Sequence, residues 1–143
     1  MTTIHKTATV SYSAQQMYNL VNDIEAYPQF LTWCTQSKIL VPGEEQLSAS
    51  LTLQAGKIKQ SFSTQNTMVP GKEIHVKLVK GPFKHLTGHW LFEDKPDNQC
   101  LITLDMSFEY KNSLIKMALS TVFNKIVDSL VDSFIQRAKQ LYG

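Results

Sequence analysis

The sequence predicts an α+β fold in which a curved, seven-stranded antiparallel sheet wraps around one long C-terminal helix. Two observations predict it. From Ser113 to Leu141 the chain has no proline or glycine, and its polar residues recur every three or four positions, the period of one solvated helix face. Before this helix, segments of alternating apolar and polar residues are separated by turn sequences at hairpin spacing, which is typical of an antiparallel meander. With 143 residues, we expect a single domain spanning 1–143.

One strand and two short helices are expected first. Residues 3–11 alternate and are rich in β-branched side chains, which favours a strand. Ser13, with Gln16 three residues later, fits a capping box that opens a helix with one apolar face. Pro28 either ends that helix or starts a second short one, because proline disfavours helix at the preceding residue but suits a first turn. The aromatic residues on either side of Pro28 are expected to pack against the core.

Six further strands are expected before the long helix. All but the last end at glycine or proline turn sequences, and each has one apolar and one polar face. The sheet should therefore have one face on the core and the other in water. The expected strands span residues 37–41, 47–55, 58–69, 74–78, 86–92 and 102–110, and the third of them alternates least cleanly.

The long helix is expected to carry the core. Ser113 fits an N-cap and Gly143 a terminator, and at about 1.5 Å per residue the helix would be roughly 40 Å long. A strongly twisted sheet curls, and its concave side can grip such a helix with room for a cavity between them. We expect the N-terminal half of the helix, from Ile115 to Ile126, to form both core and cavity wall. The half from Leu130 onward is expected to be plain packing.

The net charge of +2 conceals a basic middle segment. Residues 46–92 carry six lysines against Glu73 alone, a net charge of +5, and three of the four histidines. Such a segment attracts phosphate-rich partners, either RNA or an anionic membrane surface. Lysines on strands also keep sheet edges soluble and unpaired, and the sequence leaves both explanations open. The candidate residues for an anionic partner are Lys57, Lys59, Lys77, Lys80 and Lys84.

The residue patterns indicate neither catalysis nor a metal site. The sequence has no phosphate-binding glycine loop, G-x-S-x-G or H-E-x-x-H motif. His85 and His89 are four residues apart, which in a strand separates them by roughly 13 Å, too far to share one ion. Cys34 lies among aromatic residues and is expected to be an inert buried thiol. We expect a binding protein, not an enzyme, with no catalytic residues, no metal site and no required cofactor.

Large apolar side chains are numerous enough to line a pocket for an apolar ligand. A solid core is the alternative use of the same residues. The candidate cavity-lining residues are Phe30, Trp33, Phe62, Phe83, Leu86, Trp90, Met106, Phe108, Ile115, Leu119 and Phe123.

The cysteines and the first residues bear on location. Cys34 and Cys100 form no spaced disulfide framework, and residues 1–6 lack the apolar stretch of a signal peptide. No apolar run approaches the roughly 18 residues of a membrane-spanning helix. We expect a cytoplasmic protein with reduced thiols, whose contact with the inner membrane would be peripheral.

Two separated motifs carry a resemblance to a known family. Residues 18–34, YNLVNDIEAYPQFLTWC, resemble the signature Y-x-L-V-x-D-x-x-x-Y-P-x-F-L-P-W-C of the coenzyme Q-binding protein/ribosome association toxin RatA family, within the START-like (polyketide cyclase/lipid transport) superfamily. Residues 81–92, GPFKHLTGHWLF, are similar to that family's G-P-F-x-x-L-x-G-x-W-x-F, and Phe108-Glu109-Tyr110 leads into the final helix as it does there. Thr32 departs from the signature, which has proline at that place. The resemblance covers essentially the whole chain.

The resemblance implies the helix-grip fold, in agreement with the residue patterns, and two functions of different classes. The first is the binding of ubiquinone or a similar polyprenyl lipid in a hydrophobic tunnel, in support of respiration. The second is a toxin activity that binds the large ribosomal subunit and blocks subunit association. An aromatase/cyclase, found elsewhere in the superfamily, would need polar groups inside the pocket, for which Tyr110 and Gln60 are the candidates.

Overall fold

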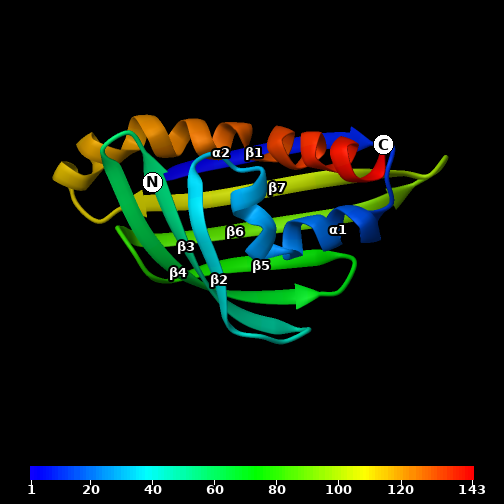
Figure 1. Ribbon diagram of the computed structural model, residues 1–143, viewed down its shortest axis with the longest axis horizontal. Helices are drawn as coiled ribbons and strands as arrows, with labels where there is room; N and C mark the ends of the chain where they lie inside the picture. Colours follow the sequence, from blue (N-terminus) through cyan, green and yellow to red (C-terminus); the bar gives the residue numbers. More distant parts are fainter.

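The computed structural model describes residues 1–143 and contains seven strands, two α-helices and one 3-10 helix (Figure 1). The helices are α1 (Ala14–Asn22), η1 (Ile24–Gln29) and α2 (Ser113–Tyr142). The strands are β1 (Thr2–Val10), β2 (Cys34–Val41), β3 (Gln46–Ala55), β4 (Ile58–Val69), β5 (Glu73–Lys80), β6 (Phe83–Lys95) and β7 (Gln99–Tyr110). The predicted elements are all present in the predicted order, and several strands extend beyond the predicted limits.

All seven strands form one antiparallel sheet in the order β1-β7-β6-β5-β4-β3-β2. Neighbours from β2 to β7 are consecutive hairpins, and only the pairing of β1 with β7 joins distant parts of the chain. The sheet is strongly curved, and α2 lies along one side of its inner face, with α1 and η1 over the rest of that face (Figure 1). The predicted α+β fold with a long gripped helix is confirmed.

The first helix begins as the sequence predicts. Ser13 Oγ accepts a hydrogen bond from the backbone N–H of Gln16 at 3.1 Å, and the Ser13 N–H donates to Gln16 Oε1 at 2.9 Å. The helix stops before Pro28, which lies inside the separate helix η1. Tyr27 of η1 donates its hydroxyl to the carbonyl of Val21 in α1, which fixes the two helices to each other.

Asn112, not Ser113, is the N-cap of α2. Its side-chain Oδ1 accepts from the N–H of Ile115 at 2.9 Å, and Ser113 is the first helical residue. Both residue types are good N-caps, so composition could not choose between these neighbours. Gly143 ends the helix as predicted, at φ 85°, a left-handed conformation that glycine adopts without strain. No helix in the structure is both long and apolar enough to cross a membrane.

The core consists of two clusters of buried side chains. One gathers α1, the C-terminal half of α2 and the sheet beneath them, and includes Met17, Trp90 and Phe134. The other surrounds the N-terminal half of α2 and is rich in aromatic residues, among them Phe83 and Phe123. The junction of the two clusters positions the candidate site.

Candidate functional site

A cavity of about 110 Å³ lies between the sheet and α2, where the two core clusters meet. Strands β3 to β7 form its floor, the middle of α2 forms its roof, and η1 with Trp33 closes one side. The lining is mostly apolar, and so suits an apolar ligand. It comprises Ile24, Tyr27, Trp33, Leu51, Phe62, Thr64, Asn66, Val76, Leu86, Gly88, Trp90, Leu104, Met106, Phe123, Ile126, Val127, Leu130 and Phe134.

Gly88 opens the floor of the cavity. It lies in β6 midway between two buried side chains, those of Leu86 and Trp90, so it occupies an inward-facing position that has no side chain. Its neighbours in register are Val76 of β5 and Met106 of β7. A Cβ at this position would meet the Val76 Cβ at 3.6 Å and the Met106 Cγ at 3.7 Å, which are ordinary contacts. A Cβ is therefore accommodated here, and the absence of a side chain at residue 88 contributes to the space in the floor of the cavity.

Two buried polar side chains face the cavity from β4. Thr64 and Asn66 are only 3% and 5% exposed, at inward positions where the alternation of a strand places apolar residues. Thr64 Oγ1 donates to Asn66 Oδ1 at 3.0 Å. This bond occupies Asn66 Oδ1, and the amide Nδ2 is the donor group of the same side chain. Because Asn66 lines the cavity, this amide can donate to an oxygen of a bound molecule.

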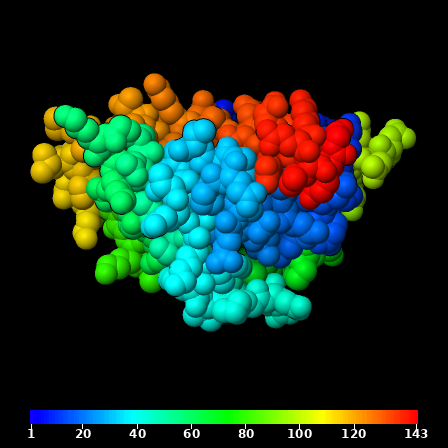
Figure 2. All heavy atoms as spheres, viewed as in Figure 1, coloured from blue at the N-terminus to red at the C-terminus, as the bar shows by residue number.

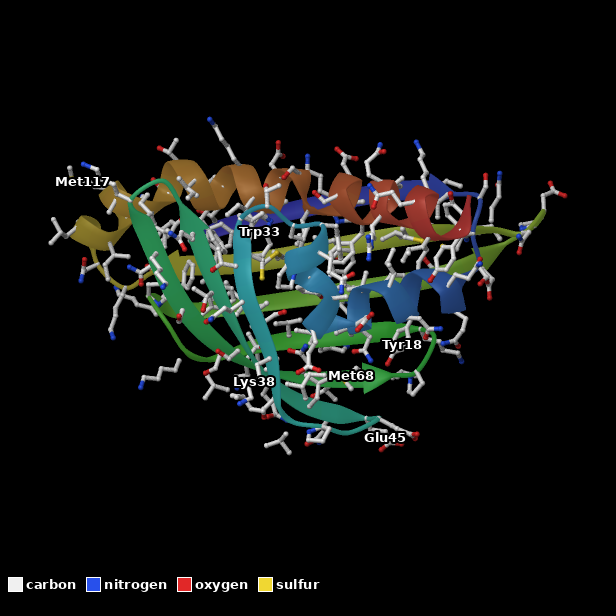
Figure 3. The ribbon with its side chains drawn as sticks, viewed as in Figure 1. Tyr18, Trp33, Lys38, Glu45, Met68 and Met117 are labelled. Atoms are coloured by element: carbon white, nitrogen blue, oxygen red, sulfur yellow. The ribbon has the colours of Figure 1, made fainter.

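Trp33, Leu51 and Phe62 are called the rim of the cavity below. These three side chains are half-buried, whereas Leu86 and Trp90 at the floor are buried. Figure 3 shows Trp33 close to α2, where η1 leads into β2. In the space-filling view α1, η1, β2 and α2 pack edge to edge over this face (Figure 2). Ligand pockets usually measure about 300–1,000 Å³, so a whole polyprenyl quinone requires the rim side chains to move.

Six of the eleven predicted lining residues surround this cavity. They come from η1–β2, from β4, β6 and β7, and from α2. They are Trp33, Phe62, Leu86, Trp90, Met106 and Phe123.

The other five predicted residues lie outside the cavity. Phe83, Phe108 and Leu119 are buried in the aromatic cluster, where the rings of Phe83 and Phe108 lie 4.8 and 5.0 Å from that of Phe123. Phe30 packs against the outer side of the core, and Ile115 is half-buried beside a surface groove. Around the N-terminal half of α2 these aromatic side chains therefore belong to the packed core.

The roles expected for the two halves of α2 therefore need correction. The cavity meets the middle of the helix, and its wall includes Leu130 and Phe134, which were expected to be plain packing. Ile126 lines it as expected, whereas Ile115 and Leu119 do not. Periodicity shows that all five face the sheet, but the position of the cavity along the helix depends on Gly88, which lies far away in sequence.

Sequence reasoning also missed the polar pair in β4. The signal was present, because residues 58–69 alternate less cleanly than the other strands. The inward positions of β4 are Phe62, Thr64, Asn66 and Met68, so the two polar residues interrupt an otherwise apolar face. The polar candidates proposed for a catalytic pocket do not line the cavity: Gln60 is exposed, and the Tyr110 hydroxyl donates to Asn124.

Four of the five predicted lysines lie toward the end of the molecule where α2 begins. Lys80 and Lys84 flank the β5–β6 turn, and the β3–β4 hairpin with Lys57 and Lys59 reaches toward the first half of α2 (Figure 1). Lys77 stands apart, on the outer face of the sheet.

Further lysines that the prediction omitted join this group. Lys111 is tied to the β5–β6 turn by its backbone hydrogen bond to Pro82, and Lys116 lies beside Lys84 around one surface groove. Lys57, Lys59, Lys80, Lys84, Lys111 and Lys116 are called the basic end below. Among them lies Glu109, 4.0 Å from Lys84.

Two exposed apolar side chains project from the basic end. Leu114 and Met117 in the first turns of α2 are 77% and 80% exposed, and Met117 points away from the body of the molecule (Figure 3). Exposed apolar groups beside lysines suit contact with another molecule or with a lipid surface.

The cysteines are buried free thiols. Burial raises the pKa of Cys34 to about 11 and that of Cys100 to about 11, so both thiols stay protonated near neutral pH. Because the thiolate is the reactive form, the prediction of an inert Cys34 agrees with this environment. His85 and His89 both lie in β6, as predicted, and the partner of His89 is Glu73 in the neighbouring strand.

A family model described as "Polyketide cyclase / dehydrase and lipid transport" matches residues 10–135. The "Ribosome association toxin RatA" of Pseudomonas aeruginosa is 42% identical over 142 residues, which cover 99% of each chain. The "Coenzyme Q-binding protein COQ10, mitochondrial" of Drosophila melanogaster is 29% identical over 96% of this chain and 59% of its own length. Among solved structures, the "Zhui aromatase/cyclase" of a Streptomyces species has a TM-score of 0.85 at 14% identity, covering 97% of this chain and 94% of that one.

Proposed function

Because this chain belongs to the polyketide cyclase/dehydrase and lipid transport family, and within it resembles both the RatA and the COQ10 proteins, we propose that it binds an apolar ligand in the cavity under α2. One observation carries the proposal: an apolar cavity, with Gly88 in its floor, lies where the two core clusters meet. An empty apolar space costs stability, because the atoms lining it lose dispersion contacts. A ligand that fills it recovers those contacts.

The ligand that fits best is ubiquinone or a similar polyprenyl quinone. Its isoprenoid chain matches the apolar walls, and a carbonyl oxygen of its ring can accept a hydrogen bond from the amide of Asn66. The cavity is smaller than such a molecule, so binding includes the outward movement of the half-buried rim at Trp33, Leu51 and Phe62. The relative named as a coenzyme Q-binding protein supports this choice of ligand.

We propose binding and not catalysis at this site. The polar side chains in the lining are the hydroxyls of Thr64 and Tyr27 and the amide of Asn66. None of these is a carboxylate, imidazole or amine that could serve as a general acid or base near neutral pH. Burial raises the pKa of Tyr27 far above its ordinary value, so this phenol keeps its proton.

The test is a titration with a short-chain ubiquinone. The chain has two tryptophans, Trp33 and Trp90, and both line the cavity, so bound quinone should quench their fluorescence. Saturable quenching at one quinone per chain supports the proposal. Quenching that rises linearly with quinone concentration, as for free tryptophan, contradicts it.

A second candidate function is binding to the large ribosomal subunit with blockage of subunit association. Relatives named as ribosome association toxins share about two-fifths of their residues with this chain over its full length, as in the 42% identical protein. The basic end supplies the positive charge that binding to ribosomal RNA requires. The two functions are compatible, because the basic end and the floor of the cavity are different parts of the molecule.

Sedimentation of ribosomes in a sucrose gradient tests this second function. Added protein should increase free subunits at the expense of whole ribosomes, and the triple variant Lys80→Glu, Lys84→Glu, Lys111→Glu should not. Reversal of Lys72 and Lys95, at the opposite end of the sheet, is the matched control. If the triple variant acts like the unmodified protein, the basic end is not the contact.

Peripheral binding to an anionic membrane would use the same lysines. It differs in its dependence on the exposed apolar residues of α2. Leu114→Asp with Met117→Asp should weaken binding to anionic vesicles, because apolar insertion is lost. The same pair should leave ribosome sedimentation unchanged, which separates the two partners.

A further inference from the structure

Titratable side chains form a row across the outer face of the sheet, on the side away from the cavity. His75 of β5 lies opposite His89 of β6, His89 lies opposite Asp105 of β7, and Asp105 lies opposite His5 of β1. Three of the four histidines of the chain therefore lie in this row, and two of them, His75 and His89, are direct cross-strand neighbours. Directly opposite residues in an antiparallel sheet have Cβ atoms about 5 Å apart, close enough to share a ligand.

Glu73 completes a cluster at one end of this row. It lies two residues before His75 on the same face of β5, and its Oε1 is 2.8 Å from His89 Nε2 and 3.3 Å from His75 Nε2. The three donor atoms all lie within 4.8 Å of one another, and the two imidazole rings are stacked with centroids 4.1 Å apart. Two imidazole nitrogens and a carboxylate oxygen form a ligand set typical of zinc.

We propose that Glu73, His75 and His89 bind a divalent transition-metal ion of the Zn²⁺ type on the outer face of the sheet. The donor spacing suits such an ion, because metal–ligand bonds of about 2.0–2.2 Å place the donors of a tetrahedral site roughly 3.3 Å apart. The carboxylate already lies near this spacing from both imidazoles. The two imidazole rings are stacked, so His75 and His89 must rotate to direct both nitrogens at one ion.

The surroundings leave room for the rest of a coordination shell. The cluster borders an open hollow of about 730 Å³ on the outer face, whose lining is mostly polar and includes Gln65 and Thr67 of β4. Water or a donor atom from another molecule can therefore complete the three-residue set, as at zinc sites with one open position.

Charges near the cluster are balanced. Lys77 lies two residues after His75 on the same face of β5, and its positive charge disfavours a bound cation. Asp105, opposite His89 in β7, favours a bound cation. Hydrogen bonds from the two histidines lower the pKa of Glu73, which keeps this carboxylate ionised. Metal binding needs deprotonated ligands and releases protons, so binding should weaken as the pH is lowered.

Without a metal, the same three side chains would only share protons, with Glu73 accepting from each histidine. Calorimetric titration of the full, untagged chain with ZnCl₂ after dialysis against a chelator separates these explanations. At pH 7.5 we expect one ion per chain, and His75→Ala or His89→Ala should weaken binding at least tenfold. Glu73→Gln should weaken it as well, since the amide is a poorer ligand.

Two histidine variants serve as matched controls. His85 lies on the same face of β6 as His89, but its ring approaches Ser107 and not the cluster, so His85→Ala is the first control. His5→Ala, which removes the histidine at the far end of the row, is the second. Both should bind Zn²⁺ like the unmodified chain, and Co²⁺ should give the visible absorption of a four-coordinate site that His89→Ala abolishes. Equal losses in all histidine variants, or no measurable binding at pH 7.5, would overturn the proposal. Circular dichroism of each variant excludes unfolding as the cause of a loss.

Discussion

Replacing Gly88 with valine should close the cavity and leave the fold intact. Three buried carbons contribute about 0.8 kcal/mol each, and removing glycine from the interior of a strand contributes roughly 0.5–1 kcal/mol. Crowding in a filled core costs about 1–3 kcal/mol. The Cβ itself meets Val76 and Met106 at ordinary distances, so the cost should lie toward the lower end. The free energy of unfolding should therefore rise by about 1–2 kcal/mol.

The affinity for the ligand should fall in the same Gly88→Val variant. If the space above Gly88 receives the ligand, the Kd for a short-chain ubiquinone should rise at least about tenfold, which corresponds to about 1.4 kcal/mol. Quenching of Trp33 and Trp90 measures the Kd, and denaturant unfolding measures the stability. Thr87→Val is the matched control, since this neighbour in β6 faces the outer side. A folded Gly88→Val protein with unchanged Kd would refute the assignment of the cavity as the ligand site.

Three further predictions follow from the same geometry. The double variant Thr64→Val, Asn66→Leu should keep its stability, because both partners of the buried hydrogen bond become apolar. Its affinity for a quinone should fall about five- to tenfold, whereas its affinity for a hydrocarbon without a carbonyl should not change. The fluorescence titration measures both affinities, and an equal loss for the two ligands would count against Asn66 as a donor. Cys34 and Cys100, whose pKa values burial raises to about 11, should not react with a thiol reagent in the native protein at pH 8 and should both react in denaturant; a fast-reacting native thiol would contradict their burial. Burial also raises the pKa of Tyr110 to about 12, so the unfolded state loses this proton at lower pH than the folded state does. The free energy of unfolding should therefore fall by up to about 1.4 kcal/mol per pH unit between pH 10 and 12. Tyr110→Phe should flatten this part of the pH profile, and an unchanged slope would show that Tyr110 does not cause it.

The fold was predictable because local patterns determine it. Turn sequences at hairpin spacing give consecutive antiparallel strands, and the polar stripe of α2 at Thr121, Lys125 and Asp128 is exposed as its period requires. The errors are local, as at the N-cap, where Asn112 and Ser113 are chemically similar candidates. The pairing of β1 with β7 joins segments about 100 residues apart in the chain, and no local pattern specifies that contact.

The cavity was predictable in kind but not in position. Alternation shows which side chains face inward, and six of the proposed lining residues do surround the space. Its place depends on three strands that meet in register at Val76, Gly88 and Met106. The same limit applies to the outer face, where the spacing of His85 and His89 within one strand excludes a metal pair, whereas the cross-strand neighbour His75 lies against His89.

The most direct test of ligand binding is to extract the protein after purification from a quinone-producing bacterium. Organic extraction and mass spectrometry of the unmodified chain should recover a polyprenyl quinone in an amount approaching one per chain. The Gly88→Val protein, purified in parallel, should carry little or none, and the Thr87→Val control should match the unmodified chain. Recovery of no quinone from the unmodified chain, or of equal amounts from it and from Gly88→Val, would contradict a ligand site under α2.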